Sequence, residues 1–302
     1  MAILNFGSLN IDYTYAVDHF VTAGETLAST SLAVNAGGKG LNQSLALAKA
    51  GAPVKHAGMV GEDGRFLVEL LQYGGVNTEL LHISDTVRSG NAIIQTDPSG
   101  ENCILLYGGA NQAIEEAYVD EVLSHMEQGD WILLQNEISC LDYIMGSASR
   151  NGLRLILNPS PVTPELLSYD LSGVSLLVLN EIEAAAIAEV DPGLDPVALA
   201  QAIRQRLPHA TVVLTLGRKG SIYLSDDTET YQDAFAVDTV DTTGAGDTFT
   251  GYLLAGLMRG DAPAQSMRNA AAASAIAVTR QGAAPSIPNR AEVEEFLRKV
   301  AQ

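Results

Sequence analysis

The stretch VDTTGAGDTFTGYLLAG, residues 240–256, joins a glycine-containing turn to an apolar segment with helical spacing. Gly244 and Gly246 leave backbone N–H groups unobstructed, and the N-terminus of the following helix adds the positive end of its dipole. Asp247 is then expected in the first helical turn, beside the place where the loop would stabilise negative charge. A carboxylate at that position is suited to accept a proton from an attacking hydroxyl, as phosphoryl transfer requires.

The same turn also has a purely structural explanation. In that interpretation the glycines only shape a strand-to-helix turn, and Asp247 favours the helix dipole by about 0.3–1 kcal/mol. One Ser or Asp would suffice as a cap, yet residues 241–247 contain two glycines and two aspartates, Asp241 and Asp247. The composition of the turn therefore favours catalysis.

Strand-like and helix-like segments alternate along the chain before this stretch. A helical pattern at 113–129 is followed by a strand-like segment at 131–138, a helical one at 140–152 and a strand-like one at 154–161. Such alternation favours a mainly parallel, doubly wound sheet covered by helices on both faces. We expect one domain over residues 1–302, with a small β insertion built from segments near 10–36 and 90–108.

The composition limits the possible partners. Hydrophobic residues make up 47% of the 302 residues and charged residues 18%, which is typical of a globular domain. The formal charge of −19, with the basic residues scattered, predicts no nucleic-acid partner and no acidic membrane partner. The longest Ala-rich apolar run, at 270–278, is far shorter than the roughly 20 residues of a membrane-spanning helix. Two cysteines without CxxC spacing and no basic leader predict a cytoplasmic location.

A second glycine-containing segment, NAGGKGLNQ at 35–43, lacks the Ser or Thr that follows the lysine of a P-loop. Its glycines let a polar ligand approach the backbone, and Lys39 and Asn42, three apart at a helix start, can face that ligand together. A glycine-softened loop before an ordinary helix is an equally open interpretation. Asn10 and Asp12 end the first strand-like segment, residues 2–12, where a strand emerges from the core.

Two further segments have the composition of a nucleotide or metal site. TLGRKGS at 215–221 surrounds two basic residues with glycines, which suits a nucleotide phosphate, although a plain hairpin turn looks the same. NEIE at 180–183 places Asn180 and Glu183 on one face of a helix start, where they could order a hydrated Mg²⁺. Solvated residues at a helix start are the equal alternative.

Together these motifs resemble those of the ribokinase family of carbohydrate kinases. GGKGLNQ, GGAN, NPSP, NEIE, TLGRKG and DTTGAGDTFTG occur in the family's order, and the resemblance extends from GSLNID to APSIP, nearly the whole chain. It implies a three-layer α/β/α fold with a β-sheet lid, and transfer of the ATP γ-phosphate to a primary sugar hydroxyl. It also implies Mg²⁺ and K⁺ as cofactors, and D-ribose, a small neutral sugar, as the acceptor.

The resemblance also assigns roles to residues. Asp247 would be the catalytic base, with an anion hole formed by Gly244, Ala245 and Gly246. The sugar would be bound by Asn10, Asp12, Gly38, Lys39, Asn42, Glu137 and Asp247. The nucleotide would be bound by Asn180, Thr215, Leu216, Gly217, Arg218, Lys219, Gly220, Gly246 and Ala271. Potassium would be held by Asp241, Thr243, Ala277, Arg280, Gly282 and Ser286, several of them through backbone carbonyls, and Mg²⁺ indirectly by Asn180 and Glu183.

Other functions remain open at this point. Asn91 stands in the lid where relatives often carry an apolar residue, which leaves deoxyribose, fructose or a nucleoside such as pseudouridine as alternative acceptors. A non-catalytic sugar-binding protein of the same fold is a different class, since a fold does not fix a function. The apolar lid segments at 91–95 and 103–107 would be exposed at a sheet edge, so we expect a homodimer through the lid.

Overall fold

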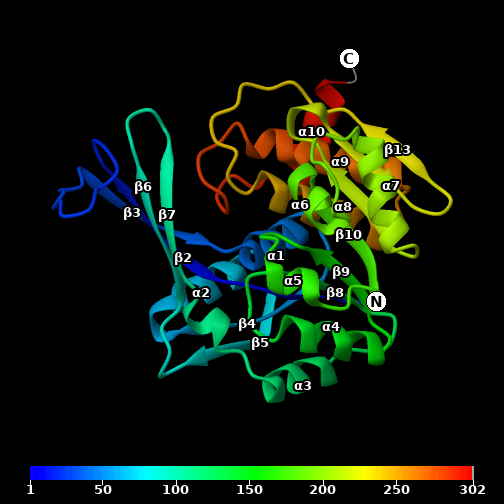
Figure 1. The fold of residues 1–302 in the computed structure, drawn as a ribbon, viewed down its shortest axis with the longest axis horizontal. Coiled ribbons are helices and arrows are strands. Elements are labelled where there is room, and N and C mark those ends of the chain that lie inside the picture. The colour runs from blue at the N-terminus through cyan, green and yellow to red at the C-terminus, as the bar shows by residue number, and fades with distance from the viewer. Residues whose placement is uncertain (301–302) are drawn as a thin grey trace.

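A nine-stranded sheet forms the centre of the molecule (Figure 1). In the computed structural model, which describes residues 1–300, its strands follow the order β13-β12-β11-β10-β9-β8-β1-β4-β5. The strands from β11 to β5 pair in parallel, and β12 and β13 add an antiparallel edge. The bounds are β1 Ile3–Phe6, β4 Val54–Gly61, β5 Asn77–Ser84, β8 Trp131–Gln135, β9 Arg154–Asn158, β10 Val174–Asn180, β11 Thr211–Thr215, β12 Ser221–Leu224 and β13 Glu229–Gln232.

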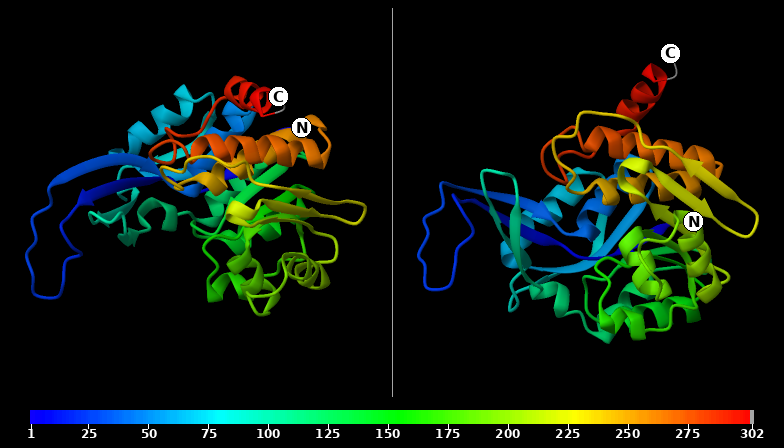
Figure 2. Two further views of the ribbon diagram at one scale, coloured as in Figure 1. Left: turned by 90° about the horizontal axis from the view of Figure 1, so that it is seen from above. Right: turned by 45° about the horizontal axis from the view of Figure 1, so that its top comes forward.

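Helices cover both faces of this sheet and make three layers (Figure 2). Successive side chains of a strand point to opposite faces, so Ile3 enters one core and Leu4 the other. One face is covered by α1 Lys39–Lys49, α2 Arg65–Tyr73, α8 Ala245–Arg259, α9 Pro263–Ala277 and α10 Arg290–Lys299. The other is covered by α3 Glu116–Ser124, α4 Leu141–Arg150, α5 Pro164–Ser168, α6 Glu181–Ala188 and α7 Pro196–Arg206. The predicted three-layer α/β/α fold is confirmed.

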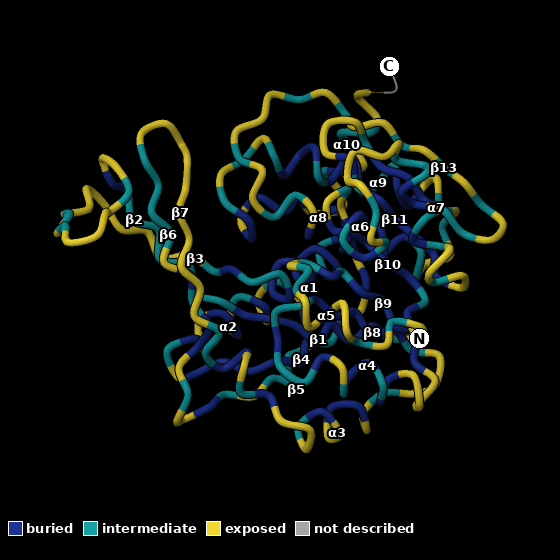
Figure 3. Tube along the Cα trace, viewed as in Figure 1, coloured by how far each residue is buried: buried dark blue, intermediate teal, exposed yellow. Residues whose placement is uncertain are grey.

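A separate four-stranded sheet projects from this body, with the order β3-β2-β6-β7 (Figures 1 and 2). We call it the small sheet; its strands are β2 Asn10–Ala16, β3 Ser31–Gly37, β6 Gly90–Thr96 and β7 Asn102–Tyr107. Every residue of β7 is exposed, as Figure 3 shows in yellow, and Leu105 and Leu106 keep 68% and 65% of their surface accessible. The prediction of a smaller sheet beside the main one is confirmed, and its apolar strand is exposed.

The structure corrects several predicted elements. The segment at 2–12 is divided at Gly7: β1 joins the main sheet and β2 the small sheet. A Cβ at Gly7 would collide with the Gln135 side chain and with the backbone of Gly40, so the chain passes close to the start of α1 at this division. The sequence also missed β5 and α5, which are short or half exposed and therefore have weak periodicity. Helix α3 ends at Ser124, earlier than predicted.

Candidate functional site

The two glycine-containing segments meet at the Asp247 carboxylate. Asp247 lies in the first turn of α8, as predicted, and α8 packs directly on α1 because Gly251 leaves no side chain between them; a Cβ there would collide with Ala46. From α1, Asn42 Nδ2 donates to Asp247 Oδ2 at 3.0 Å and Gln43 Nε2 donates to Asp247 Oδ1 at 2.8 Å. Both carboxylate oxygens are therefore held by amides more than 200 residues away in sequence.

The protonation of Asp247 reflects its buried position. Burial raises the pKa of Asp247, while the Lys39 ammonium and the two amide hydrogen bonds oppose that rise. The pKa of Lys39 is lowered by burial, but attraction to Asp247, Glu137 and Glu183 outweighs this and leaves it above its usual value. A carboxylate with a raised pKa beside a retained positive charge is typical of a general base.

Glu137 connects the loop after β8 to the start of α1. Its Oε2 accepts hydrogen bonds from the Lys39 backbone N–H at 3.1 Å and from the Ser8 hydroxyl. Gly38, the residue before α1, has φ +93°, and a Cβ there would lie 2.8 Å from the Ser8 carbonyl. The turn therefore requires glycine, and it brings Gly38, Lys39 and Glu137 together as the sequence predicted.

Asn10 and Asp12 reach the same place from the small sheet. Asp12 lies against the Gly37 backbone, where a Cβ would overlap its carboxylate. Burial, followed by repulsion from Glu137, raises the pKa of Asp12 to about 6. Asn111, outside the predicted set, donates from Nδ2 to Asn10 Oδ1 at 2.8 Å and pairs with both backbone groups of Leu9. The Asn10 side chain is thus held in place before any ligand binds.

The loop at 244–246 borders a cavity of about 170 Å³ at the carboxyl ends of the parallel strands. Gly244 has φ +72°, and a Cβ there would lie 2.8 Å from the Cβ of Ala283, so only glycine fits. The N–H groups of Gly244 and Gly246 form no hydrogen bond with any residue of 1–300, whereas the N–H of Ala245 donates to the Thr242 carbonyl at 3.2 Å. Two of the three predicted anion-hole donors are therefore free in this structure. The lining residues are Lys39, Asn158, Ser160, Val178, Leu179, Asn180, Glu183, Thr215, Thr242, Gly244, Ala245, Gly246, Asp247 and Thr250.

Only part of the predicted nucleotide set lines this cavity. Gly246 lines it, and so do Asn180 and Thr215, at the ends of β10 and β11, because parallel strands bring their carboxyl ends to one edge of the sheet. Asn180 and Glu183 also form a capping box on α6. The predicted residues Leu216, Gly217, Arg218, Lys219 and Gly220 form the adjoining turn at 216–220, where Lys219 forms an exposed ion pair with Glu181. Ala271 is buried in α9 and is not among the residues that line the cavity.

The two segments predicted to hold K⁺ lie side by side. Asp241 Oδ2 accepts from the Gly282 N–H at 2.8 Å, and the Asp241 N–H donates to the Val278 carbonyl at 3.2 Å. Asp241 Oδ1 accepts from the backbone and hydroxyl of Thr243. The Ala277 and Ser286 carbonyls each accept one hydrogen bond from Arg280, which leaves each a second lone pair. The fold thus brings Asp241 to the carbonyl-rich turn at 277–286.

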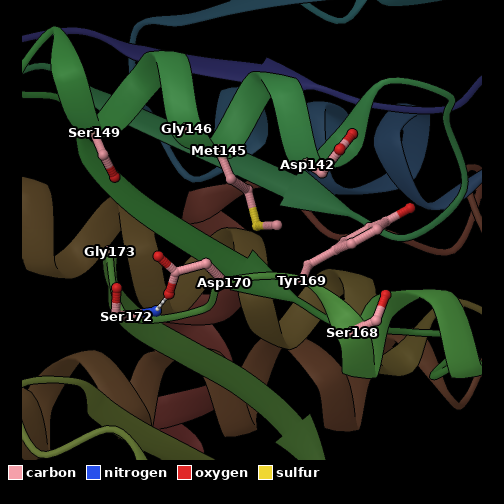
Figure 4. A pocket seen from close by; sticks show the side chains of 9 residues that line it. All are labelled: Asp142, Met145, Gly146, Ser149, Ser168, Tyr169, Asp170, Ser172 and Gly173. Carbon is pink, nitrogen blue, oxygen red and sulfur yellow. Dashed lines mark hydrogen bonds between the residues drawn. The ribbon is translucent and has the colours of Figure 1, made fainter.

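A second cavity, of about 550 Å³, lies between α4 and the segment that leads from α5 to β10 (Figure 4). The side chains of Met145 and Tyr169 and the carboxylates of Asp142 and Asp170 border it, and Asp170 accepts a hydrogen bond from the Ser172 N–H. It contains no residue of the predicted site and no lysine or arginine. The smaller cavity has convergent amides, a lysine and a carboxylate of raised pKa, so we place the candidate active site there.

The family model of the pfkB family carbohydrate kinases matches residues 2–290. The chain belongs to this family. Among its relatives, ribokinase from Haemophilus influenzae is 34% identical over 297 residues, which cover 96% of each chain. Deoxyribokinase from Salmonella typhi is 28% identical over 317 residues, covering 98% of this chain and 99% of the relative. The solved structure of Arabidopsis thaliana ribokinase complexed with ribose and ATP is similar with a TM-score of 0.86, at 29% identity over 99% of both chains.

Membership of the pfkB family confirms the predicted resemblance and the prediction of a carbohydrate kinase. The family match does not by itself assign the individual site residues. In the kinase, Gln43 and Asn111 are the site residues that the sequence analysis did not predict. Both lie inside quoted motifs, GGKGLNQ and GGAN, but only the folded chain reveals that they hold Asp247 and Asn10. No helix within residues 1–300 has the length and apolar character needed to cross a bilayer.

Proposed function

We propose that this kinase transfers the γ-phosphate of ATP to the primary hydroxyl of D-ribose and forms ribose 5-phosphate. The observation that carries the proposal is the Asp247 carboxylate, which accepts from the Asn42 amide and borders the same cavity as Lys39 and the free N–H groups of Gly244 and Gly246. The ribokinase relatives, one of them complexed with ribose and ATP, support this choice of substrates.

The sugar would be held by groups that match neutral hydroxyls. Asn42 Oδ1 is fully buried and has no hydrogen-bond partner among residues 1–300, so it is free to accept from a sugar hydroxyl. Asp12 and Glu137 supply carboxylate acceptors, while Asn10, Lys39 and the Gly38 backbone complete the predicted set. A neutral sugar needs no arginine clamp, and this set contains no arginine.

In the transfer step, Asp247 accepts the proton of the primary hydroxyl as that oxygen forms a bond to the γ-phosphorus. The bond between the γ-phosphorus and the bridging oxygen breaks, and ADP leaves with that electron pair. The N–H groups of Gly244 and Gly246, at the positive end of α8, stabilise the charge on the transferring group. Lys39 adds a positive charge to the same cavity.

Two cations fit the residues present. Glu183 Oε2 accepts from the Asn180 N–H, and Oε1 forms no hydrogen bond with any residue of the described chain, so it can order the water shell of a nucleotide-bound Mg²⁺. Potassium would be held by Asp241, Thr243 and the carbonyl-rich turn at 277–286. When bound, these ions would offset negative charge on the phosphates and around the anion loop.

We also propose one kinase domain over the whole chain, with the small sheet as its lid and the cytoplasm as its location. The strand register places the exposed Leu32 and Val34 of β3, Ile93 of β6 and Leu105 of β7 on one face of the lid, where they form an apolar surface. Packing against the lid of a second copy would remove this surface from water. The lid is therefore the proposed homodimer interface.

The proposal is tested by measuring ADP release with ATP, Mg²⁺ and K⁺ over a panel of ribose, deoxyribose, fructose, adenosine and pseudouridine. We expect the highest kcat/KM with ribose and a fall when K⁺ is replaced by Na⁺. A higher kcat/KM with deoxyribose would transfer the assignment to the second candidate, which the deoxyribokinase relatives favour. Ribose binding in calorimetry without any ADP release would indicate a non-catalytic protein.

A further inference from the structure

A row of polar side chains crosses the main sheet beneath α1 and α8. His56, Asn5, Gln135 and Asn158 come from the adjacent strands β4, β1, β8 and β9. Asn5 and His56 are register partners, as are Gln135 and Asn158. His56, Asn5 and Gln135 are completely buried, next to a core cluster of hydrophobic side chains.

These side chains form one continuous hydrogen-bonded chain that ends at the active site. His56 Nδ1 lies 2.7 Å from Ser44 Oγ, and Ser44 Oγ accepts from Asn5 Nδ2 at 2.8 Å. Gln135 Nε2 donates to Asn5 Oδ1 at 2.9 Å and to Gln43 Oε1 at 2.7 Å. Gln43 Nε2 then donates to Asp247 Oδ1 at 2.8 Å. We call Gln43, Gln135, Asn5, Ser44 and His56 the amide chain.

The direction of every hydrogen bond in the amide chain follows from the carboxylate at its end. Ionised Asp247 can only accept, so the Gln43 amide must present its NH₂ group there and its oxygen to Gln135. The same logic orients Gln135 and then Asn5. Burial lowers the pKa of His56 to about 4, so His56 is neutral near pH 7. Ser44 accepts from Asn5, and its hydroxyl can donate to Nδ1 of the neutral His56 ring.

Stability alone does not account for the amide chain. Buried polar groups contribute little net stability even when fully paired, and apolar side chains of the same shape can replace them at small cost. Within residues 1–300, only Gln135 Oε1 and His56 Nε2 of the amide chain are buried without a partner. The network fixes one arrangement, because an amide that rotated would leave further groups without partners. Such a network is suited to hold the group at its end.

We propose that the amide chain fixes the orientation and protonation of the Asp247 carboxylate, with Gln43 and Gln135 as positioning residues for phosphoryl transfer. The inference rests on the proposed function, in which Asp247 is the base. Gln43 acts directly on Asp247 Oδ1 and also donates to Asn158 Oδ1 at 3.1 Å. Gln135 acts one step further away, by holding the Gln43 amide in the orientation that faces Asp247.

Three charged groups lie near Asp247, and the experiment must distinguish their effects from that of the Gln43 amide. Lys39 at the start of α1 lowers its pKa and Glu137 raises it, and Glu183 lines the same cavity from α6. The Gln43 hydrogen bond also lowers the pKa of Asp247. Removal of this donor leaves Lys39, Glu137 and Glu183 in place, so a change in titration reports the amide itself.

The test uses Gln43→Met and Gln135→Met, which keep length and volume but remove the amide. The ¹³C carboxyl signal of Asp247, assigned with Asp247→Asn, is followed against pH. We expect Gln43→Met to raise the titration midpoint by about one pH unit and Gln135→Met to raise it by less. We also expect kcat to fall about tenfold or more, with the acid limb of its pH profile displaced upward and KM for the sugar within about twofold.

Gln72→Met, at an exposed glutamine of α2, is the matched control and should leave the Asp247 titration midpoint, kcat and KM for the sugar unchanged. An unchanged Asp247 midpoint in both test variants would overturn the inference. If Gln43→Met does not fold, Gln135→Met decides alone, because it leaves both hydrogen bonds to Asp247 in place. The midpoint is measured without turnover, so an enzyme that failed to phosphorylate ribose would refute the proposed function and still test the amide chain.

Discussion

The main sheet beneath α1 and α8 buries polar side chains, whereas the small sheet exposes apolar ones. Beneath the two helices, Asn5, Gln135 and His56 are completely buried; Gln135 donates to Asn5, and Ser44 Oγ bonds both Asn5 and His56. In the small sheet, Leu105 and Leu106 of β7 are about two-thirds exposed. Burial of polar side chains and exposure of apolar ones both lower the stability of the isolated chain, so each arrangement needs another explanation. The two proposals account for this contrast: the first region would hold a reacting group, and the second would be covered by a partner.

The strongest test of the buried region is Asp247→Asn, which keeps the shape of the side chain but cannot accept a proton. We expect kcat to fall by about 10²–10⁴-fold, as for loss of a general base. The expected change in the dissociation constant of ribose is within about threefold, since the other sugar-binding groups remain. Single-turnover ADP release and calorimetry measure the two quantities. Turnover within a factor of two of wild type would contradict the role of base.

Asp12 tests the junction between the two regions, because β2 belongs to the small sheet while the Asp12 carboxylate faces the site. Its pKa of about 6 means that it loses its charge as pH falls from 7 to 5. An ionised carboxylate accepts two sugar hydroxyls more readily than a protonated one, so we expect KM for ribose to rise about tenfold over that range. In Asp12→Asn, KM should be high and independent of pH.

Asp12 also makes a prediction for stability. A carboxyl whose pKa is raised in the folded state binds more protons there than in the unfolded state between about pH 4 and 6, so the free energy of unfolding falls as pH rises through that window. Asp12→Asn removes the titrating carboxyl and therefore this loss of stability at high pH. We expect it to stabilise the ligand-free protein by about 1–2 kcal/mol at pH 8, less than two full pKa units would give because Asp12 retains some solvent contact. Urea unfolding at pH 8 and pH 4 provides the comparison, with no gain expected at pH 4.

Of the substitutions, one in the small sheet is expected to affect folding least. Leu105→Asp places a charge on the exposed apolar surface, which the proposed dimer cannot bury, while the core of each copy is untouched. We expect light scattering to change from a dimer to a monomer, with the melting temperature of the main body lowered by less than about 3 °C. Glu101→Asp, a conservative change at the tip of the same hairpin, is the control. A wild-type protein that is already monomeric at micromolar concentration would refute the dimer.

The sequence predicted the features that depend on neighbouring residues. Alternating strand and helix patterns gave the three-layer fold, and the glycine turn before an apolar helix placed Asp247 in the first turn of α8. The start of α1 at Lys39 followed in the same way from two glycines and a helical run. Each of these signals comes from residues close together in sequence, and at that range periodicity and backbone freedom determine which element forms.

Other features were decided only by the tertiary structure. Periodicity does not tell which sheet a strand joins, so only the folded chain shows that the segment at 2–12 is divided between β1 of the main sheet and β2 of the small sheet. The contact of Gln43 with Asp247 joins residues 204 positions apart, and the row from His56 to Asn158 exists because four strands lie side by side. The local sequence determines which elements form and which side chains they carry; packing of those elements determines which side chains meet, because a contact between distant segments leaves no periodic trace in either one.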